Sequence, residues 1–214
     1  MLTWSEFYNQ FSIQLNEQQQ SAVQSVTGPV LLLAVPGSGK TMVLVTRLGY
    51  MIFCRGIAPE KILTVTYTVA ATKDMSERFA SRFGQDLADR LEFRTINGIC
   101  ARVIQYYGRK TARTAFSLLT DEKRISAILF AIYQKTERVY PTEGDLKNVR
   151  TLITYIKNRM LNEKEIEALD ETSEIRISAI YKEYCKHLRE NQLMDYDDQM
   201  VYAYNMLRKI PWLL

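Results

Sequence analysis

The chain has 214 residues, of which 47% are hydrophobic and 24% are charged, which is enough for one large domain or two small ones with packed cores. Its 28 Lys and Arg residues against 24 Asp and Glu give a net charge of +4, which is compatible with a polyanionic partner but does not require one. No apolar run approaches the roughly 18 residues of a membrane span, and the N-terminus lacks a basic region followed by an apolar stretch, so we expect a cytoplasmic protein without a membrane partner.

The cysteines are few and widely spaced. Cys54, Cys100 and Cys185 are odd in number, and His187 is the only histidine. Zinc sites built from Cys and His need four ligands, usually in closely spaced pairs. We therefore expect reduced, structural thiols rather than a disulfide framework or a metal site.

The first predicted elements are a helix, a buried strand and a second helix. Asn16 is a suitable N-cap for a helix through residues 17–23. The apolar residues 30–35 predict a strand buried on both faces, and helical spacing returns over residues 39–53.

A strand followed by a helix is then predicted twice more. Residues 62–66 are β-branched and apolar, and residues 70–83 are rich in helix formers. A weaker strand is expected at residues 93–95, followed by a helix at residues 97–107. Alternating strands and helices imply a parallel sheet with right-handed crossovers.

Beyond Tyr107 the pattern becomes helical, and no strand is convincing. Helices are expected over residues 120–135, 142–160, 163–169, 173–191 and 195–209. We therefore divide the chain into an α/β domain at residues 1–113, an all-helical insertion at residues 114–193 and a return to the first domain at residues 194–214.

The most specific motif joins the end of the strand expected at residues 30–35 to the start of the helix expected at residues 39–53. It reads Ala34-Val35-Pro36-Gly37-Ser38-Gly39-Lys40-Thr41. A phosphate cradle needs glycines where the backbone approaches the phosphates, a Lys for the β and γ phosphates and a hydroxyl for Mg²⁺. The motif therefore predicts ATP and Mg²⁺ as cofactors, with Lys40 and Thr41 as catalytic residues and Thr41 as the metal ligand. A glycine-rich turn that happens to contain Lys-Thr is the alternative.

With this loop, the chain resembles the UvrD/Rep/PcrA class of superfamily 1 helicases, whose loop often begins with Ala. Leu15-Asn16-Glu17-Gln18-Gln19 matches the family's Leu-Asn-x-x-Gln stretch upstream of the loop. The resemblance implies that Gln19 reads the adenine edge, and a solvated helix glutamine is the alternative. Met42 stands where these helicases commonly have an Arg on the adenine, so we expect an apolar nucleotide contact there.

A second segment resembles the family's Thr-Phe-Thr-Asn-Lys-Ala-Ala-x-Glu-Met. It reads Thr66-Tyr67-Thr68-Val69-Ala70-Ala71-Thr72-Lys73-Asp74-Met75. The resemblance implies that Thr66, Tyr67 and Thr68 bind single-stranded DNA, with the Tyr67 ring stacked on a base. Core packing of Tyr67 is the alternative, and Val69 and Ala70 replace polar residues of the family.

Two weaker matches lie further along the chain. Arg94-Thr95-Ile96-Asn97-Gly98 stands where the family shows Thr-Phe-His followed by a small residue, which adds Thr95 and Asn97 to the expected DNA contacts. Asp195-Tyr196-Asp197-Asp198 is close to the family's Asp-Phe-Asp-Asp, but an N-terminal helix cap is the better interpretation.

We therefore expect a P-loop NTPase (RecA-like) parallel sheet, incomplete at its C-terminal side, with an all-helical inserted subdomain. The resemblance implies the ATP-binding portion of a DNA helicase that translocates on single-stranded DNA in repair, replication or recombination. It implies as partners the remainder of a helicase chain and a duplex junction held by the insertion. The family's Asp-Glu pair is absent from these residues, so we expect no effective ATP hydrolysis by them alone. The alternatives are another P-loop enzyme, such as a kinase, and a non-enzymatic module from a degenerate helicase.

Overall fold

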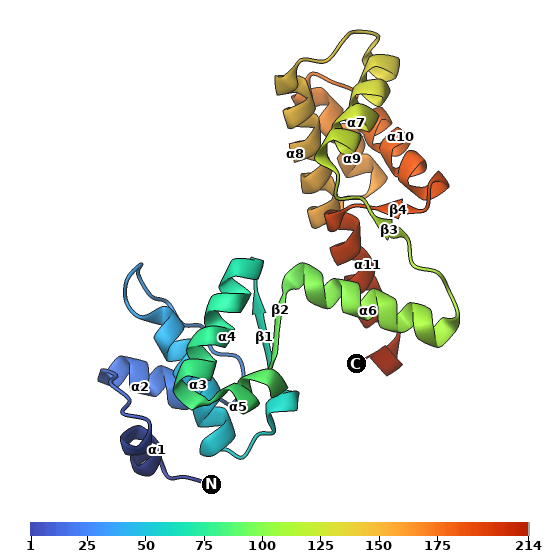
Figure 1. Ribbon diagram of the computed structural model, residues 1–214. Coiled ribbons are helices and arrows are strands. Elements are labelled where there is room, and N and C mark those ends of the chain that lie inside the picture. Colours follow the sequence, from blue (N-terminus) through green and yellow to red (C-terminus); the bar gives the residue numbers. More distant parts are fainter. Residues whose placement is uncertain (214) are drawn as a thin grey trace. The chain divides into compact units, whose positions relative to one another are not determined.

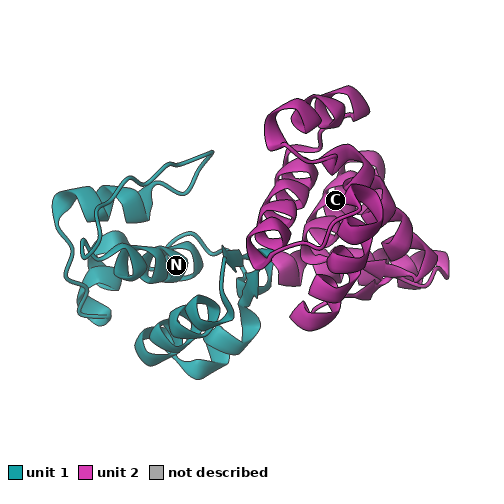
Figure 2. Ribbon diagram, turned by 90° about the horizontal axis from the view of Figure 1, so that it is seen from above, with its two compact units in different colours: residues 1–96 teal, residues 97–214 magenta. Residues whose placement is uncertain are grey.

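The chain folds into two compact units. The computed structural model describes residues 1–213, and the two units are Met1–Ile96 and Asn97–Leu214 (Figure 2). The sequence places its first boundary at residue 113 instead. The difference is α6 (Ile96–Thr111), whose Ile104 packs with residues of the second unit in one small core. Among residues 1–213, no helix is long and apolar enough to cross a membrane.

The first unit combines helices with a two-stranded parallel sheet (Figure 1). Its elements are α1 (Trp4–Gln10), α2 (Glu17–Gln24), α3 (Lys40–Phe53), the 3-10 turn η1 (Pro59–Lys61), β1 (Leu63–Thr66), α4 (Val69–Phe83), α5 (Gln85–Arg90) and β2 (Glu92–Thr95). In the sheet, Leu63 pairs with Glu92 and Thr66 pairs with Thr95. The strands expected at residues 62–66 and 93–95 are confirmed, as are the three helices expected in this unit.

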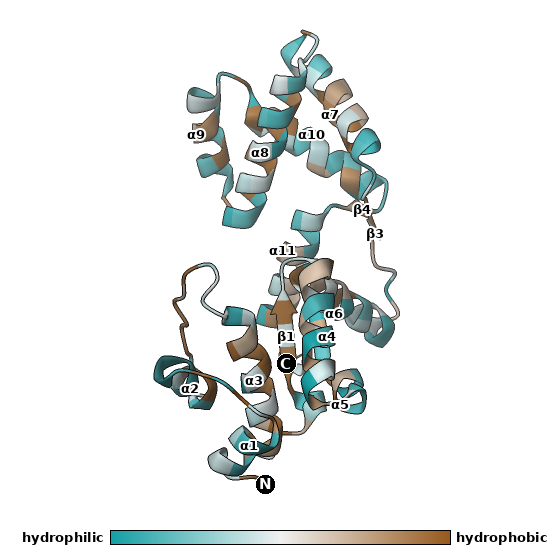
Figure 3. Cartoon of the chain, turned by 60° about the vertical axis from the view of Figure 1, so that its left-hand side comes forward, coloured by the Kyte–Doolittle hydropathy of each residue, from teal (hydrophilic) through white to brown (hydrophobic). Residues whose placement is uncertain are grey.

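The apolar residues 30–35 do not form a strand. They run outside any helix or strand between α2 and α3, where Figure 3 colours them hydrophobic, and the side chains of Leu31 and Leu33 are each 82% exposed. The expectation of a strand buried on both faces is therefore wrong for the described residues. A buried parallel strand needs paired neighbours on its edges and helices on its faces, whereas among the described residues β1 and β2 pair only with each other.

Aromatic packing joins α4 to α1 and α3 in this unit, since the Phe83 ring of α4 lies 5.9 Å from the Phe53 ring of α3. The Phe83 ring of α4 stacks on Phe7 with centroids 5.9 Å apart, and Phe7 and Phe79 are fully buried. A Cβ atom at Gly49 of α3 would overlap the Phe83 ring. The glycine therefore lets the two helices approach more closely than any other residue would allow.

The second unit is mainly helical. Its elements are α6, β3 (Ser117–Leu118), α7 (Glu122–Glu137), α8 (Glu143–Arg159), α9 (Glu163–Ser173), α10 (Ile177–Glu190), β4 (Leu193–Met194), α11 (Tyr196–Lys209) and the 3-10 turn η2 (Pro211–Leu213). The expected helices are confirmed. The expectation that this part contains no strand is wrong, because β3 and β4 pair in parallel. Two-residue strands are too short to produce a recognisable alternation in the sequence.

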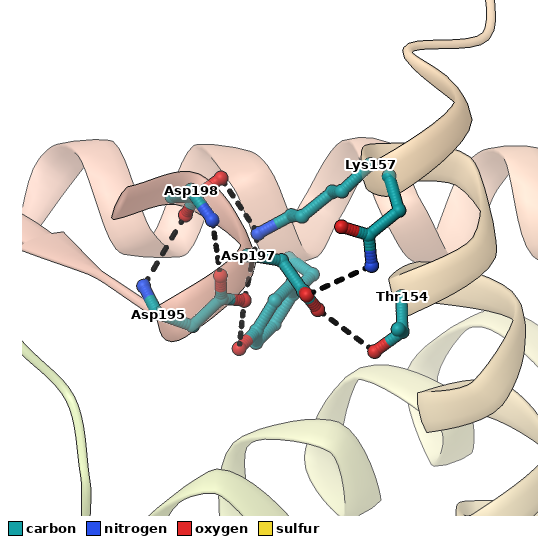
Figure 4. Close-up of polar contacts among 7 residues, drawn as sticks. Thr154, Lys157, Asp195, Asp197 and Asp198 are labelled. Atoms are coloured by element: carbon teal, nitrogen blue, oxygen red, sulfur yellow. Dashed lines mark hydrogen bonds and ion pairs between the residues drawn. The ribbon is translucent and has the colours of Figure 1, made fainter. Parts of the chain in front are cut away.

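The second unit contains a buried ion-pair cluster (Figure 4). Lys157 of α8 is 4% exposed, and its Nζ lies 2.7 Å from Asp195 Oδ2 and 2.8 Å from Asp198 Oδ1. The Tyr184 hydroxyl donates to Asp195 Oδ2 over 3.1 Å. Burial opposes the charge of Lys157, but the two carboxylates outweigh it and raise its pKa, while burial raises the pKa of Asp198.

The same aspartates cap α11. Asp195 accepts a hydrogen bond from the backbone N–H of Asp198 at 2.8 Å, and Asp198 accepts one from the backbone N–H of Asp195 at 3.3 Å. This reciprocal arrangement is a capping box. The interpretation of residues 195–198 as a helix cap is therefore confirmed.

We predict that Lys157→Met destabilises the chain by about 3–5 kcal/mol, because it leaves two carboxylates facing each other inside the protein. The matched control is Lys135→Met, which removes an ion pair to Glu183 whose Lys135 side chain is 73% exposed, and we expect it to cost no more than about 1 kcal/mol. Urea unfolding followed by circular dichroism measures both values. Equal stabilities of the two variants would contradict the assignment.

Candidate nucleotide and nucleic-acid site

The candidate phosphate loop, residues 34–41, turns sharply before α3. Gly37 and Gly39 have φ values of +80° and +79°, in the left-handed region that glycine enters without strain. The backbone N–H of Ser38 donates to the Val35 carbonyl oxygen over 3.3 Å. The two glycines are therefore required by the shape of the turn.

The start of α3 is not closed by a side chain. Its N-cap is Gly39, and no side chain within residues 1–213 caps the helix by accepting a hydrogen bond from its first amides. By contrast, Asn16 caps α2 and Thr68 caps α4. Uncapped amides at the positive end of a helix dipole form a favourable environment for an anion.

Two further polar groups of the loop suit a phosphate ligand. Lys40 Nζ donates to the carbonyl oxygens of Ala34 at 3.1 Å and Val35 at 2.7 Å, so the ammonium lies over the loop. Ser38 Oγ is buried and has no hydrogen-bond partner within the described residues. Thr41, the expected Mg²⁺ ligand, lies in the first turn of α3. The residues of the loop therefore fit a nucleotide phosphate with its metal ion.

Gln19 joins α2 to this loop. Its side-chain oxygen accepts from the backbone N–H of Asn16 over 3.0 Å, and its Nε2 donates to the Ser38 carbonyl oxygen over 3.1 Å. A Cβ atom at Gly39 would lie 3.3 Å from the same Nε2. The structure thus brings Gln19 to the loop, although its base-reading role stays a prediction.

Met42 faces the space between α3 and α4. It lines an open cavity of about 680 Å³ together with Phe11, Val45, Asp74 and Arg78, among others. Its side chain is thus accessible from that cavity. The predicted apolar contact to a nucleotide remains a prediction.

The predicted DNA-binding segment lies between β1 and α4. Thr66 ends β1, and its Oγ1 donates to the Thr68 carbonyl oxygen over 3.0 Å. The Thr68 side chain accepts from the backbone N–H of Ala71 over 3.1 Å and caps α4. Tyr67 between them is 89% exposed, so core packing does not explain this ring.

Thr95 and Asn97 are the two remaining residues expected to contact DNA. Thr95 ends β2 directly opposite Thr66 in the sheet, so it shares the strand-end position of the segment above. Asn97 belongs to the second unit, and its Oδ1 is buried without a hydrogen-bond partner among the described residues. The structure thus brings Thr95 beside the Thr66–Thr68 segment, whereas the DNA contact expected from Asn97 stays a prediction.

The cysteines take no part in this site. Cys54, Cys100 and Cys185 are free thiols, and burial raises the pKa of each of them. Thiols in such surroundings are held in the unreactive protonated form.

Comparison with known proteins places nearly the whole chain in one family. Residues 15–214 match the family described as UvrD/REP helicase N-terminal domain. The chain is 31% identical over 212 residues to the ATP-dependent DNA helicase PcrA of Bacillus subtilis (strain 168), which covers 96% of this chain and 28% of that protein.

Two further relatives match the chain over a similar length. The ATP-dependent DNA helicase PcrA of Staphylococcus aureus (strain Mu50 / ATCC 700699) is 26% identical over 205 residues, which covers 94% of this chain and 27% of that protein. The protein of the same name from Leuconostoc citreum is 25% identical over 198 residues, which covers 92% and 26% respectively. The chain thus spans little more than a quarter of the length of these curated relatives.

Proposed function

The chain belongs to the UvrD/REP helicase N-terminal domain family, and from this premise we propose that it is the ATP-binding portion of a DNA helicase that translocates on single-stranded DNA. Membership of the family implies a RecA-like α/β fold. The observation that carries the proposal is the uncapped start of α3 behind the loop of residues 34–41, with Lys40 over the loop and Gln19 bound to Ser38.

The loop supplies the groups that a triphosphate requires. Lys40 would exchange two neutral carbonyl partners for the β and γ phosphates, and the stronger charge-assisted bonds favour that exchange. The Thr41 hydroxyl would coordinate Mg²⁺. Gln19, already at the loop, would turn its amide to the adenine edge. Bound Mg²⁺-ATP would supply the phosphoryl chemistry that drives movement.

Tyr67 is the residue we propose to hold DNA. An exposed ring at a strand end can stack on any base, which suits a protein that moves along a strand regardless of sequence. The ring belongs to the segment that begins α4, and α4 packs on α3 through Phe83 and Gly49. This packing offers a direct mechanical route between the nucleotide loop and the DNA segment.

We propose that residues 114–193 form a helical insertion that meets a duplex junction, and that the helicase acts in cytoplasmic DNA repair. We propose further that residues 1–214 alone turn over ATP poorly. After β1 and β2 the chain continues with Tyr67 and Ile96, rather than with paired carboxylates that could hold Mg²⁺ and orient water.

We predict that Lys40→Ala weakens Mg²⁺-ATP binding by at least about tenfold, because it removes a charged donor from the phosphates. Isothermal titration calorimetry measures the effect. The matched control is Lys61→Ala, which removes another exposed Lys in η1 and should leave the affinity unchanged. Equal affinities of Lys40→Ala and the parent would show that the loop does not hold the phosphates.

We predict that Tyr67→Ala weakens binding to labelled oligothymidine by about tenfold or more, while Tyr67→Phe retains it, because stacking needs the ring and not the hydroxyl. Fluorescence anisotropy measures both. Tyr140→Ala is the control, because Tyr140 is 75% exposed on the second unit. A folded Tyr67→Ala variant that binds like the parent would remove Tyr67 from the DNA site.

A further inference from the structure

Two segments of the second unit carry basic side chains and no acidic ones. Residues 96–120 contain four basic side chains and residues 199–214 contain two, and neither segment contains Asp or Glu. The six are Arg102, Arg109, Lys110, Arg113, Arg208 and Lys209. The chain as a whole is nearly balanced at +4, so positive charge is concentrated on α6 and the C-terminal half of α11. Such concentration is the electrostatic signature of a polyanion partner.

Aromatic rings lie among these charges. The Tyr107 ring of α6 stacks on Trp212 of η2 with centroids 6.1 Å apart and planes 15° apart. Tyr106, one residue earlier, is 40% exposed and Trp212 is 51% exposed, and Lys110 Nζ lies 5.8 Å from the Tyr106 ring centroid. Exposed rings interleaved with basic side chains are the combination that single-stranded nucleic acid uses for stacking.

A cavity opens between α6 and α11 at this surface. Its volume is about 290 Å³, near the lower limit for small-ligand pockets. The lining includes the rings of Tyr107 and Tyr202 together with Arg113 and Met206, and it contains no carboxylate. Arg113 Nη1 donates to the Tyr107 hydroxyl over 3.5 Å, which places the guanidinium beside the ring at the cavity.

We propose that this α6–α11 surface, defined by Tyr106, Tyr107, Arg113, Tyr202 and Trp212, binds single-stranded nucleic acid, with one unstacked base entering the cavity. The rings and Met206 offer an apolar, partly aromatic lining for the base, and the basic side chains offer contacts to the phosphates on either side. A duplex fits less well, because its bases are paired and stacked and cannot enter a cavity without being extruded. The residues of this surface belong to the second unit, whereas the Tyr67 segment belongs to the first.

The test is anisotropy on labelled oligothymidine at several salt concentrations, using the full chain. Tyr202→Ala should weaken binding about tenfold with little change in salt dependence, and Tyr202→Phe should bind like the parent. Arg113→Ala should also weaken binding, and it should reduce the slope of log affinity against log salt by about 0.7, because one phosphate contact is lost.

A matched pair on α8 provides the control. Arg159 lies over the Tyr155 ring at 5.9 Å, outside the cavity, so Tyr155→Ala and Arg159→Ala remove the same residue types at another exposed site. Both should leave the affinity unchanged. Circular dichroism establishes that each variant is folded.

Each outcome decides the proposal. If the folded Tyr202→Ala and Arg113→Ala variants both bind oligothymidine like the parent, the proposal is overturned. An equal loss of affinity in the α8 controls also overturns it.

The kind of ligand is tested separately. If a blunt duplex of the same length binds as tightly as oligothymidine, and Tyr202→Ala weakens its binding equally, base insertion is overturned. Polyglutamate that competes as well as unlabelled oligothymidine would assign the surface to an acidic protein partner instead. If only Tyr67→Ala weakens binding, the result supports the DNA contact of Tyr67 proposed above and overturns this surface. If only Tyr202→Ala and Arg113→Ala weaken binding, the result supports this surface and overturns the DNA contact of Tyr67.

Discussion

The close contact between Gly49 of α3 and the Phe83 ring of α4 governs the geometry of the first unit. Phe83 sits in a group of rings that includes Phe7 and Phe79, so α4 cannot shift without disturbing the core. Because α3 begins at the candidate phosphate loop and α4 begins beside Tyr67, this contact fixes the elements that carry both segments. A larger residue at position 49 would separate the helices and with them the two proposed binding segments.

Several groups without a hydrogen-bond partner among the described residues lie together at the candidate site. Reciprocal capping boxes close α1, α2, α8, α9 and α11. In contrast, α3 begins at an uncapped Gly39, Ser38 Oγ is buried without a partner, and Leu31 and Leu33 are exposed just upstream. α5 and α10 also begin without a side-chain cap, but within residues 1–213 only at this loop does an uncapped helix start meet a lysine, a buried unpartnered hydroxyl and two glycines in the left-handed region. Several such features that meet at one loop point to function there.

The sequence predicts helices and helix caps, which depend on neighbouring residues. It misses strand pairing and side-chain contacts, which depend on residues far apart in the chain. The cap at Asn16, the helix at residues 39–53 and the cap at Asp195 carry local signals and are confirmed. The strand at residues 30–35 fails because an apolar run cannot show whether strands pair beside it. Lys157 gives no signal either, since a helical lysine suggests a solvated face until the fold brings Asp195 and Asp198 to it. At the site, the glycines of the loop are predictable, whereas the bond from Gln19 to Ser38 is not.

We propose that the loop before α3 holds the phosphates of a nucleotide. Titration of Mg²⁺-ATP into isotopically labelled chain, followed by amide resonances in nuclear magnetic resonance spectra, tests it residue by residue. We expect the backbone amides of Gly37, Gly39, Lys40 and Thr41 to shift most and to saturate together. The Gln19 side-chain amide should shift with them as it leaves Ser38. Saturable shifts confined to other residues, with these resonances unmoved, would contradict it.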